Sequence, residues 1–197
     1  MIVMQLSPAM APDEIRVKRG VSWRALQAFL VKRGDEQPRI AYLEGTLELM
    51  SPSRKHDHIS RRFVAVVEAY LDHLGLRYQT TGAWLLRNAG KAAALEPDES
   101  FVLHDLRKKR PDLAIEVVVS SGTLKKLEIY RRLRIHEVWF WHRRKGIEVH
   151  VLTPRGYEKR TESQCVPSCD FALVRSLLKV PATSDVKARL RKRLPPR

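Results

Sequence analysis

RPDLAIEVVVSSGTLKKLEIY, residues 110–130, is the stretch that decides the fold. Six of the seven residues at positions 113–119 are apolar, as in a central strand covered on both faces. Glu116 is the lone charge there, and an ionised carboxylate in such a strand is costly unless a cation or hydrogen-bond donors meet it. We therefore expect a positive group beside Glu116. The alternative is that Glu116 lies at a strand end and reaches solvent or a structural arginine.

A short helix is predicted directly after this strand, over residues 123–133. Lys126 and Tyr130 are one turn apart and share a face of that helix. A helix in this position can bring Lys126 back over Glu116. The alternative, a solvated lysine near a helix N-terminus, fits Lys125 better than Lys126.

Hydrophobic periodicity and capping residues predict the other elements. Ser22 and Gly34 are expected to cap the two ends of a first helix, and an apolar stripe at helical spacing predicts the longest helix over residues 55–74. A last helix is expected around 171–180. Alternation on either side of Gly45 predicts two strands within residues 39–50. Further strands are predicted at 76–86, 98–103, 113–119, 137–142 and 147–152.

This order of elements predicts an α/β fold with a mixed central β-sheet flanked by α-helices. At 197 residues, the chain is long enough for one domain with tails. We expect a flexible lead at residues 1–20, a folded domain at 21–182 and a basic tail at 183–197.

The charge of the chain points to a polyanionic partner. Lys and Arg number 37 against 22 Asp and Glu, which gives a net charge of +15. Such an excess favours nucleic acid first and an anionic membrane surface second. The basic tail explains only part of it, because removing its six cations leaves about +9.

Other sequence features indicate an ordinary cytoplasmic protein. Cys165 and Cys169 lack further Cys or His partners in sequence for a zinc site, so a pair of reduced thiols is expected. The first residues do not have the pattern of a signal peptide, and no apolar stretch is long enough for a membrane span.

Two Pro-Asp dipeptides supply candidates for a second acid. Asp98 follows Pro97 at the start of one predicted strand, and Asp112 follows Pro111 at the start of the Glu116 strand. Two carboxylates on adjacent strands together with an ammonium group can hold Mg²⁺ against a phosphodiester. The residues alone leave the choice between the two aspartates open.

Four segments, in their order and spacing, resemble the Uma-two family: YLEGTLELMSPSRKH (42–56), LEPDESF (95–101), the 110–130 stretch and HEVWFW (136–141). That family is a large bacterial group of proteins assigned as endonucleases of the PD-(D/E)XK type. The similarity extends from about residue 21 to about residue 180. It implies a restriction-endonuclease-like core.

The resemblance also implies the main site residues. The acid of the PD motif falls on Asp98 rather than Asp112, and the second acid falls on Glu116. The lysine that normally follows two residues later is replaced by Val118 in this chain. In this family it is typically displaced onto the next helix, four residues before a tyrosine, which matches Lys126 and a supporting Tyr130.

Three further residues are less firmly placed by the resemblance. An additional acid from the first hairpin falls on Glu48 or Glu44, with Glu48 favoured. His56 matches a histidine after the SPS turn, where a hydrogen-bonding role at the helix start is expected rather than a catalytic one.

The resemblance and the charge together imply a Mg²⁺-dependent DNA endonuclease, in which Mn²⁺ can substitute. Asp98 and Glu116 would ligate the metal, and Lys126 would orient the attacking water or stabilise charge on the phosphate. The basic run at 107–110 is either a contact to the DNA backbone or a solvated loop.

Two other functions compete with this one. A non-catalytic module on a nuclease fold could bind nucleic acid or a protein, although a pure binder has no physical need for two acids and a lysine. A membrane-bound basic protein lacks an amphipathic helix with an aromatic anchor. No residue pattern marks a dimer interface, so the sequence leaves a homodimer open.

Overall fold

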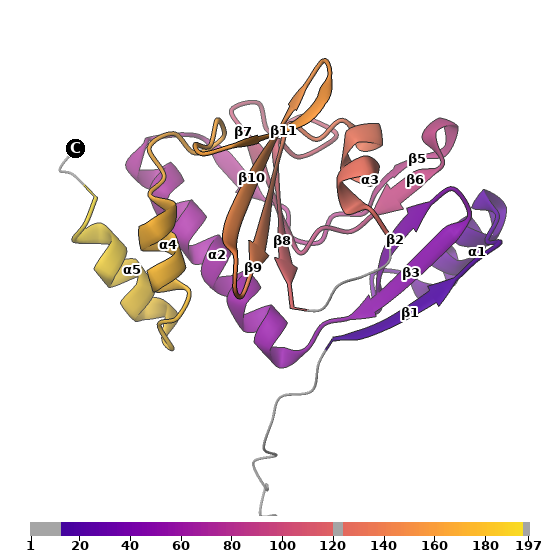
Figure 1. The fold of residues 1–197 in the computed structure, drawn as a ribbon, viewed down its shortest axis with the longest axis horizontal. Coiled ribbons are helices and arrows are strands. Elements are labelled where there is room, and N and C mark those ends of the chain that lie inside the picture. The colour runs from indigo at the N-terminus through magenta and orange to yellow at the C-terminus, as the bar shows by residue number, and fades with distance from the viewer. Residues whose placement is uncertain (1–12, 120–123, 195–197) are drawn as a thin grey trace, which may run out of the picture.

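The computed structural model describes residues 13–119 and 124–194 and contains two β-sheets flanked by helices (Figure 1). The larger sheet has the order β11-β10-β9-β8-β7-β4. Its strands are β4 (Tyr78–Thr80), β7 (Glu99–Leu103), β8 (Leu113–Val118), β9 (Glu137–His142), β10 (Gly146–Thr153) and β11 (Gly156–Arg160). β8 and β9 run parallel and the other neighbouring pairs run antiparallel, so this is the mixed sheet that the sequence predicts.

The smaller sheet is antiparallel and has the order β1-β3-β2-β6-β5. Its strands are β1 (Glu14–Lys18), β2 (Arg39–Leu43), β3 (Thr46–Ser51), β5 (Leu86–Asn88) and β6 (Ala93–Leu95). β2 and β3 form the expected hairpin around Gly45, whose φ of 85° suits glycine. This second sheet was not anticipated, because its two sides come from distant parts of the chain.

Local capping explains where the first two helices begin. Ser22 accepts a hydrogen bond from the backbone N–H of Ala25 at the start of α1 (Trp23–Arg33). Ser53 does the same for the N–H of His56 at the start of α2 (Arg54–His73). The other helices are the 3₁₀ turn η1 (Ala89–Lys91), α3 (Lys126–Leu133), α4 (Phe171–Leu177) and α5 (Thr183–Arg191).

β8 lies between two layers of helix, as its apolar sequence predicts. Figure 1 shows α2, α4 and α5 on one side of the larger sheet and α3 on the other, between the two sheets. Leu113, Ile115 and Val117 pack into the core that α2, α4 and α5 cover, whereas Ala114 packs into the core around α3. Glu116 alternates with the first set and therefore faces α3.

Two segments differ from what the sequence pattern indicates. Residues 76–86 do not form one strand: β4 and β5 belong to different sheets. The lead expected at 1–20 contains β1, which pairs with β3. β1 has only two apolar residues, Ile15 and Val17, which is too few for a period to be recognised. Residues 1–12 of that lead and residues 120–123 lie outside the described part of the chain.

Within the basic tail expected at 183–197, residues 183–191 form α5. Val186 and Leu190 are fully buried against the core, while the basic side chains of this helix lie at its surface. None of the described helices is long and apolar enough to cross a membrane. Cys165 and Cys169 are free thiols, as expected.

Replacing Leu190 by alanine tests whether α5 is part of the folded domain. Because Leu190 is fully buried, Leu190→Ala should lower the free energy of unfolding by about 2–5 kcal/mol in urea denaturation. Arg189→Ala, on the exposed face of the same helix, should change it by less than about 0.5 kcal/mol. Equal effects of the two substitutions would contradict the burial of α5.

Candidate active site

Glu116 is buried beside the positive charge that its position requires. Its side chain is 1% exposed, and the Nζ of Lys126 lies 2.6 Å from its Oε2. The hydroxyl of Tyr130 donates a short hydrogen bond to its Oε1. Both carboxylate oxygens are thus met by donors from one face of α3. Glu116 does not reach solvent, and its cation is the lysine that the sequence indicated.

The position of Lys126 follows from how α3 packs. Ile129, Tyr130 and Leu133 are buried in a core that α3 shares with both sheets. This packing fixes the helix over β8 and points its first turn at Glu116. The side chain of Lys126 remains 25% exposed, so it reaches both the buried carboxylate and the open space in front of it.

Of the two candidate aspartates, Asp98 lies close to Glu116, whereas Asp112 does not. Asp98 lies between β6 and β7, and its Oδ2 accepts the backbone N–H of Val117, next to Glu116, at 2.7 Å. Arg39 on β2 forms an ion pair with its Oδ1. Asp112 lies at the opposite end of β8, where it pairs with the Nζ of Lys108 at 2.7 Å.

His56 links Asp98 to the beginning of the described chain. Its Nε2 lies 2.8 Å from Oδ2 of Asp98, and its Nδ1 lies 3.1 Å from Oδ2 of Asp13. Asp13 also accepts the backbone N–H of Ser53 at 2.8 Å. Burial would lower the pKa of His56, but the hydrogen bonds with Asp13 and Asp98 outweigh burial and raise this pKa to about 9. His56 is therefore a cation at neutral pH, in contact with a candidate metal ligand.

Two residues of this network were missed from the sequence. Asp13 precedes a short strand without a recognisable pattern, and Arg39 resembles any polar residue at a strand start. Their roles depend on pairing between distant strands, for which local sequence carries no signal.

The two glutamates of the first hairpin have different surroundings. Glu48 is buried, and its Oε2 lies 3.4 Å from the backbone N of Leu124, close to the start of α3. Glu44 is 63% exposed and pairs with Arg132 at 2.7 Å. The structure therefore brings Glu48, and not Glu44, to the same place as Lys126.

The two buried acids have pKa values shifted in opposite directions. Burial and the nearby charge of Asp98 raise the pKa of Glu116, even though Lys126 opposes them. Burial also acts to raise the pKa of Asp98, but His56, Lys126 and Arg39 lower it below its usual value. Asp98 is thus ionised at neutral pH. At Glu116 the neighbouring positive charge does not fully offset the effects of burial and of Asp98.

A pocket of about 590 Å³ lies next to these groups. Asp98 and Glu116 do not line it themselves, but their partners His56, Val117 and Lys126 do. Its lining also includes the acids Asp13 and Glu48 and the apolar residues Val118, Leu124 and Phe140. Phe140 is the neighbour of Glu116 in the β8–β9 register.

Asp98 and Glu116 are suitable ligands for a divalent metal ion, although both carboxylates already bind other side chains of the protein. Within the described residues, no three His, Cys, Asp or Glu side chains are grouped as a ready metal site. Carboxylate oxygens are nevertheless the ligands that Mg²⁺ and Mn²⁺ prefer. The raised pKa of Glu116 indicates a carboxylate that a further cation would stabilise.

The charge on His56 predicts how stability depends on pH. Since its pKa is about 9 in the folded protein and about 6.5 in an unfolded chain, its contribution is complete below pH ~6.5. That contribution, about 3 kcal/mol, should be lost as the pH rises through 9. Urea denaturation between pH 6 and about 10 should show this loss in the wild type and a flatter profile in His56→Asn. The exposed His58→Asn variant is the control and should keep the wild-type profile.

Comparison with known proteins identifies the family and the fold. The sequence model of the Uma2 (Uma-two) family, described as "Putative restriction endonuclease", matches residues 25–175. The structure is similar to a crystal structure of a putative nuclease belonging to DUF820 from Anabaena variabilis, with a TM-score of 0.52 and 19% sequence identity. The match covers 82% of this chain and 96% of that one. No curated protein sequence matches the chain. The chain has a restriction-endonuclease-like nuclease fold, and it belongs to the Uma2 family.

Proposed function

We propose that the protein is a divalent-metal-dependent endonuclease that hydrolyses phosphodiester bonds in DNA. One observation carries the proposal: Glu116 is buried against Lys126 while Asp98 binds the very next backbone N–H of β8. Two acids and an ammonium group thus converge directly behind a pocket that Lys126 lines. This is the arrangement of charges that phosphodiester hydrolysis requires.

Asp98 and Glu116 are the residues that would hold the metal, with Glu48 as a third acid nearby. When bound, a divalent ion would polarise the scissile phosphate and lower the pKa of a bound water. The pocket also holds the acids Asp13, Glu48, Glu128 and Glu148, whose oxygens suit such a cation.

Lys126 would contact the substrate. Its Nζ is anchored by Glu116, and its side chain is partly exposed toward the pocket. An ammonium group held in this way stabilises negative charge on the phosphate oxygens and orients the attacking water. Tyr130, fully buried behind Glu116, would keep the carboxylate in position.

The competing proposal is a binding module without catalysis. It is favoured by the engagement of the acids with protein groups, since Arg39 and His56 hold Asp98 while Lys126 and Tyr130 hold Glu116. Metal binding separates the two proposals.

Substitution of the acids should abolish cleavage. Asp98→Ala and Glu116→Ala should each lower Mg²⁺-dependent nicking of plasmid DNA by at least about 10²-fold, because each removes a metal ligand. Lys126→Gln should lower it by about 10²-fold, because it removes the positive charge that acts on the phosphate. Glu44→Gln, in the exposed hairpin acid, is the matched control and should retain activity. Circular dichroism checks that the variants fold. Nicking that survives in both acid variants would overturn the proposed site.

Metal binding should also be visible without any substrate. Calorimetry should detect Mg²⁺ or Mn²⁺ binding with a sub-millimolar dissociation constant, and an ion at ten times that constant should stabilise the fold by about 1.4 kcal/mol. Asp98→Asn should remove both effects, since it removes a ligand charge. Wild-type protein that binds neither ion would support the binding module instead.

A further inference from the structure

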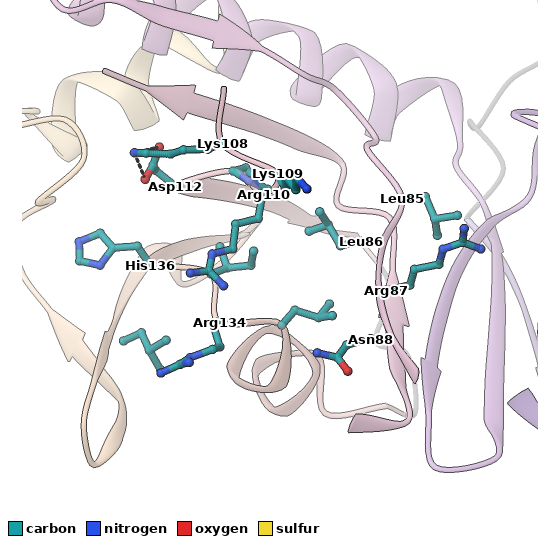
Figure 2. A pocket seen from close by; sticks show the side chains of 14 residues that line it. Leu85, Leu86, Arg87, Asn88, Lys108, Lys109, Arg110, Asp112, Arg134 and His136 are labelled. Carbon is teal, nitrogen blue, oxygen red and sulfur yellow. Dashed lines mark hydrogen bonds and ion pairs between the residues drawn. The ribbon is translucent and has the colours of Figure 1, made fainter. Parts of the chain in front are cut away.

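A second pocket, of about 940 Å³, lies at the other end of β8 from the acids (Figure 2). It is formed by the loop before β8, the end of α3, the start of β9 and β5 from the smaller sheet. Its polar lining is basic: Arg87, Lys108, Lys109, Arg110, Arg134 and His136. It shares no lining residue with the pocket at the acids. Along β8 the two are separated by about 17 Å, because Asp112 lines one and Val117 the other.

The positive charge of this pocket is not compensated. Asp112 is the acidic side chain that lines it within the described chain, and Lys108 already pairs with Asp112 at 2.7 Å. Among the described residues, no carboxylate lies within ion-pair distance of Arg87, Lys109, Arg110 or Arg134. Figure 2 shows these four cations coming from three different segments, with the side chain of Arg87 directed away from the other three. All four side chains are exposed, so their positive charge is open to a polyanion from solution.

The basic surface continues beyond this pocket. A smaller pocket of about 230 Å³ is also lined by Arg134, together with Arg131 and Arg155, which pair with Glu128 and Glu158. Arg134 therefore connects two cationic hollows in a row. A row of cations suits a chain of phosphates better than a single anion.

Arg134 holds a central place on this surface. It ends α3 in the left-handed conformation, with φ 58° and ψ 44°. Glycine or asparagine is preferred there, because a Cβ atom is strained in this region. The side chain of Arg134 lines both basic pockets.

We infer that this surface is a second nucleic-acid site, which holds the phosphodiester backbone about 17 Å along β8 from the cleavage site and without reading the base sequence. This inference rests on the proposed function in one respect: the proposed function identifies the polyanion as nucleic acid. Arg87, Arg110 and Arg134 donate to phosphate oxygens, and Lys109 adds charge. The site explains why the folded domain is basic although the pocket at the acids is not.

Salt dependence of binding tests this site directly. The probe is a fluorescent duplex bound by the full chain in EDTA, so that neither metal nor cleavage enters the measurement. Arg87→Gln, Arg110→Gln and Arg134→Gln combined should weaken binding at least about tenfold at low salt and reduce the slope of log K against log salt by about 0.9 for each lost phosphate contact. The control replaces Arg24, Lys32 and Arg189, exposed cations on other faces, by glutamine.

A single substitution separates binding from stability. Arg134→Gly should relieve the strained backbone and raise the melting temperature by about 2–4 °C, while it weakens duplex binding. If Arg134 had no part in binding, the substitution would raise the melting temperature and leave duplex binding unchanged.

The outcomes are distinguishable from those of the proposed function. If the triple variant binds with the same affinity and slope as its charge-matched control, the second site is wrong, whether or not Glu116→Ala abolishes nicking. The second site would also be overturned if the triple variant bound the duplex normally but no longer bound anionic lipid vesicles. That result would indicate a membrane surface instead. Conversely, the triple variant can lose binding in EDTA even if the wild type never cleaves, which supports the second site alone.

Discussion

The structure depends on placing one carboxylate inside an apolar strand. Glu116 is surrounded by residues that pack into hydrophobic cores on both faces of β8. A buried carboxylate is tolerable only when donors and a cation satisfy it, and here Lys126 and Tyr130 do so from one turn of α3. The position of α3 is thus tied both to hydrophobic packing and to this electrostatic requirement.

A second set of charges joins the two sheets at the same place. Asp98, from the connection between β6 and β7, contacts Arg39 of β2 and His56 of α2, and His56 contacts Asp13. These four residues come from four separate segments and alternate in sign. Alternation lets each charge be buried with a partner, so the network holds the smaller sheet against β8 while leaving Lys126 facing the pocket.

The sequence predicted those parts of the fold and of the candidate site that depend on local pattern. The apolar strand around Glu116, the long helix α2 and the spacing from Lys126 to Tyr130 are visible because each lies within a few turns of chain. The choice of Asp98 over Asp112 needed the family resemblance, since both follow a proline at a strand start. Arg39 and Asp13 could not be found, because their roles arise from strand pairing across the smaller sheet. The burial of α5 was masked by its many cations, although Val186 and Leu190 supply its apolar face.

β1 is an edge strand, and this has a consequence for the network behind the pocket. Strands at the border of a sheet open locally at a lower free energy than central strands such as β8. Each such opening removes the carboxylate that directly precedes β1 from the imidazole it neutralises. The protonation of that imidazole, and through it the charge balance at the neighbouring aspartate, is therefore coupled to the docking of the first strand. A chain that begins too late, or carries a bulky fusion at this end, would fold its core normally and still present an altered pocket.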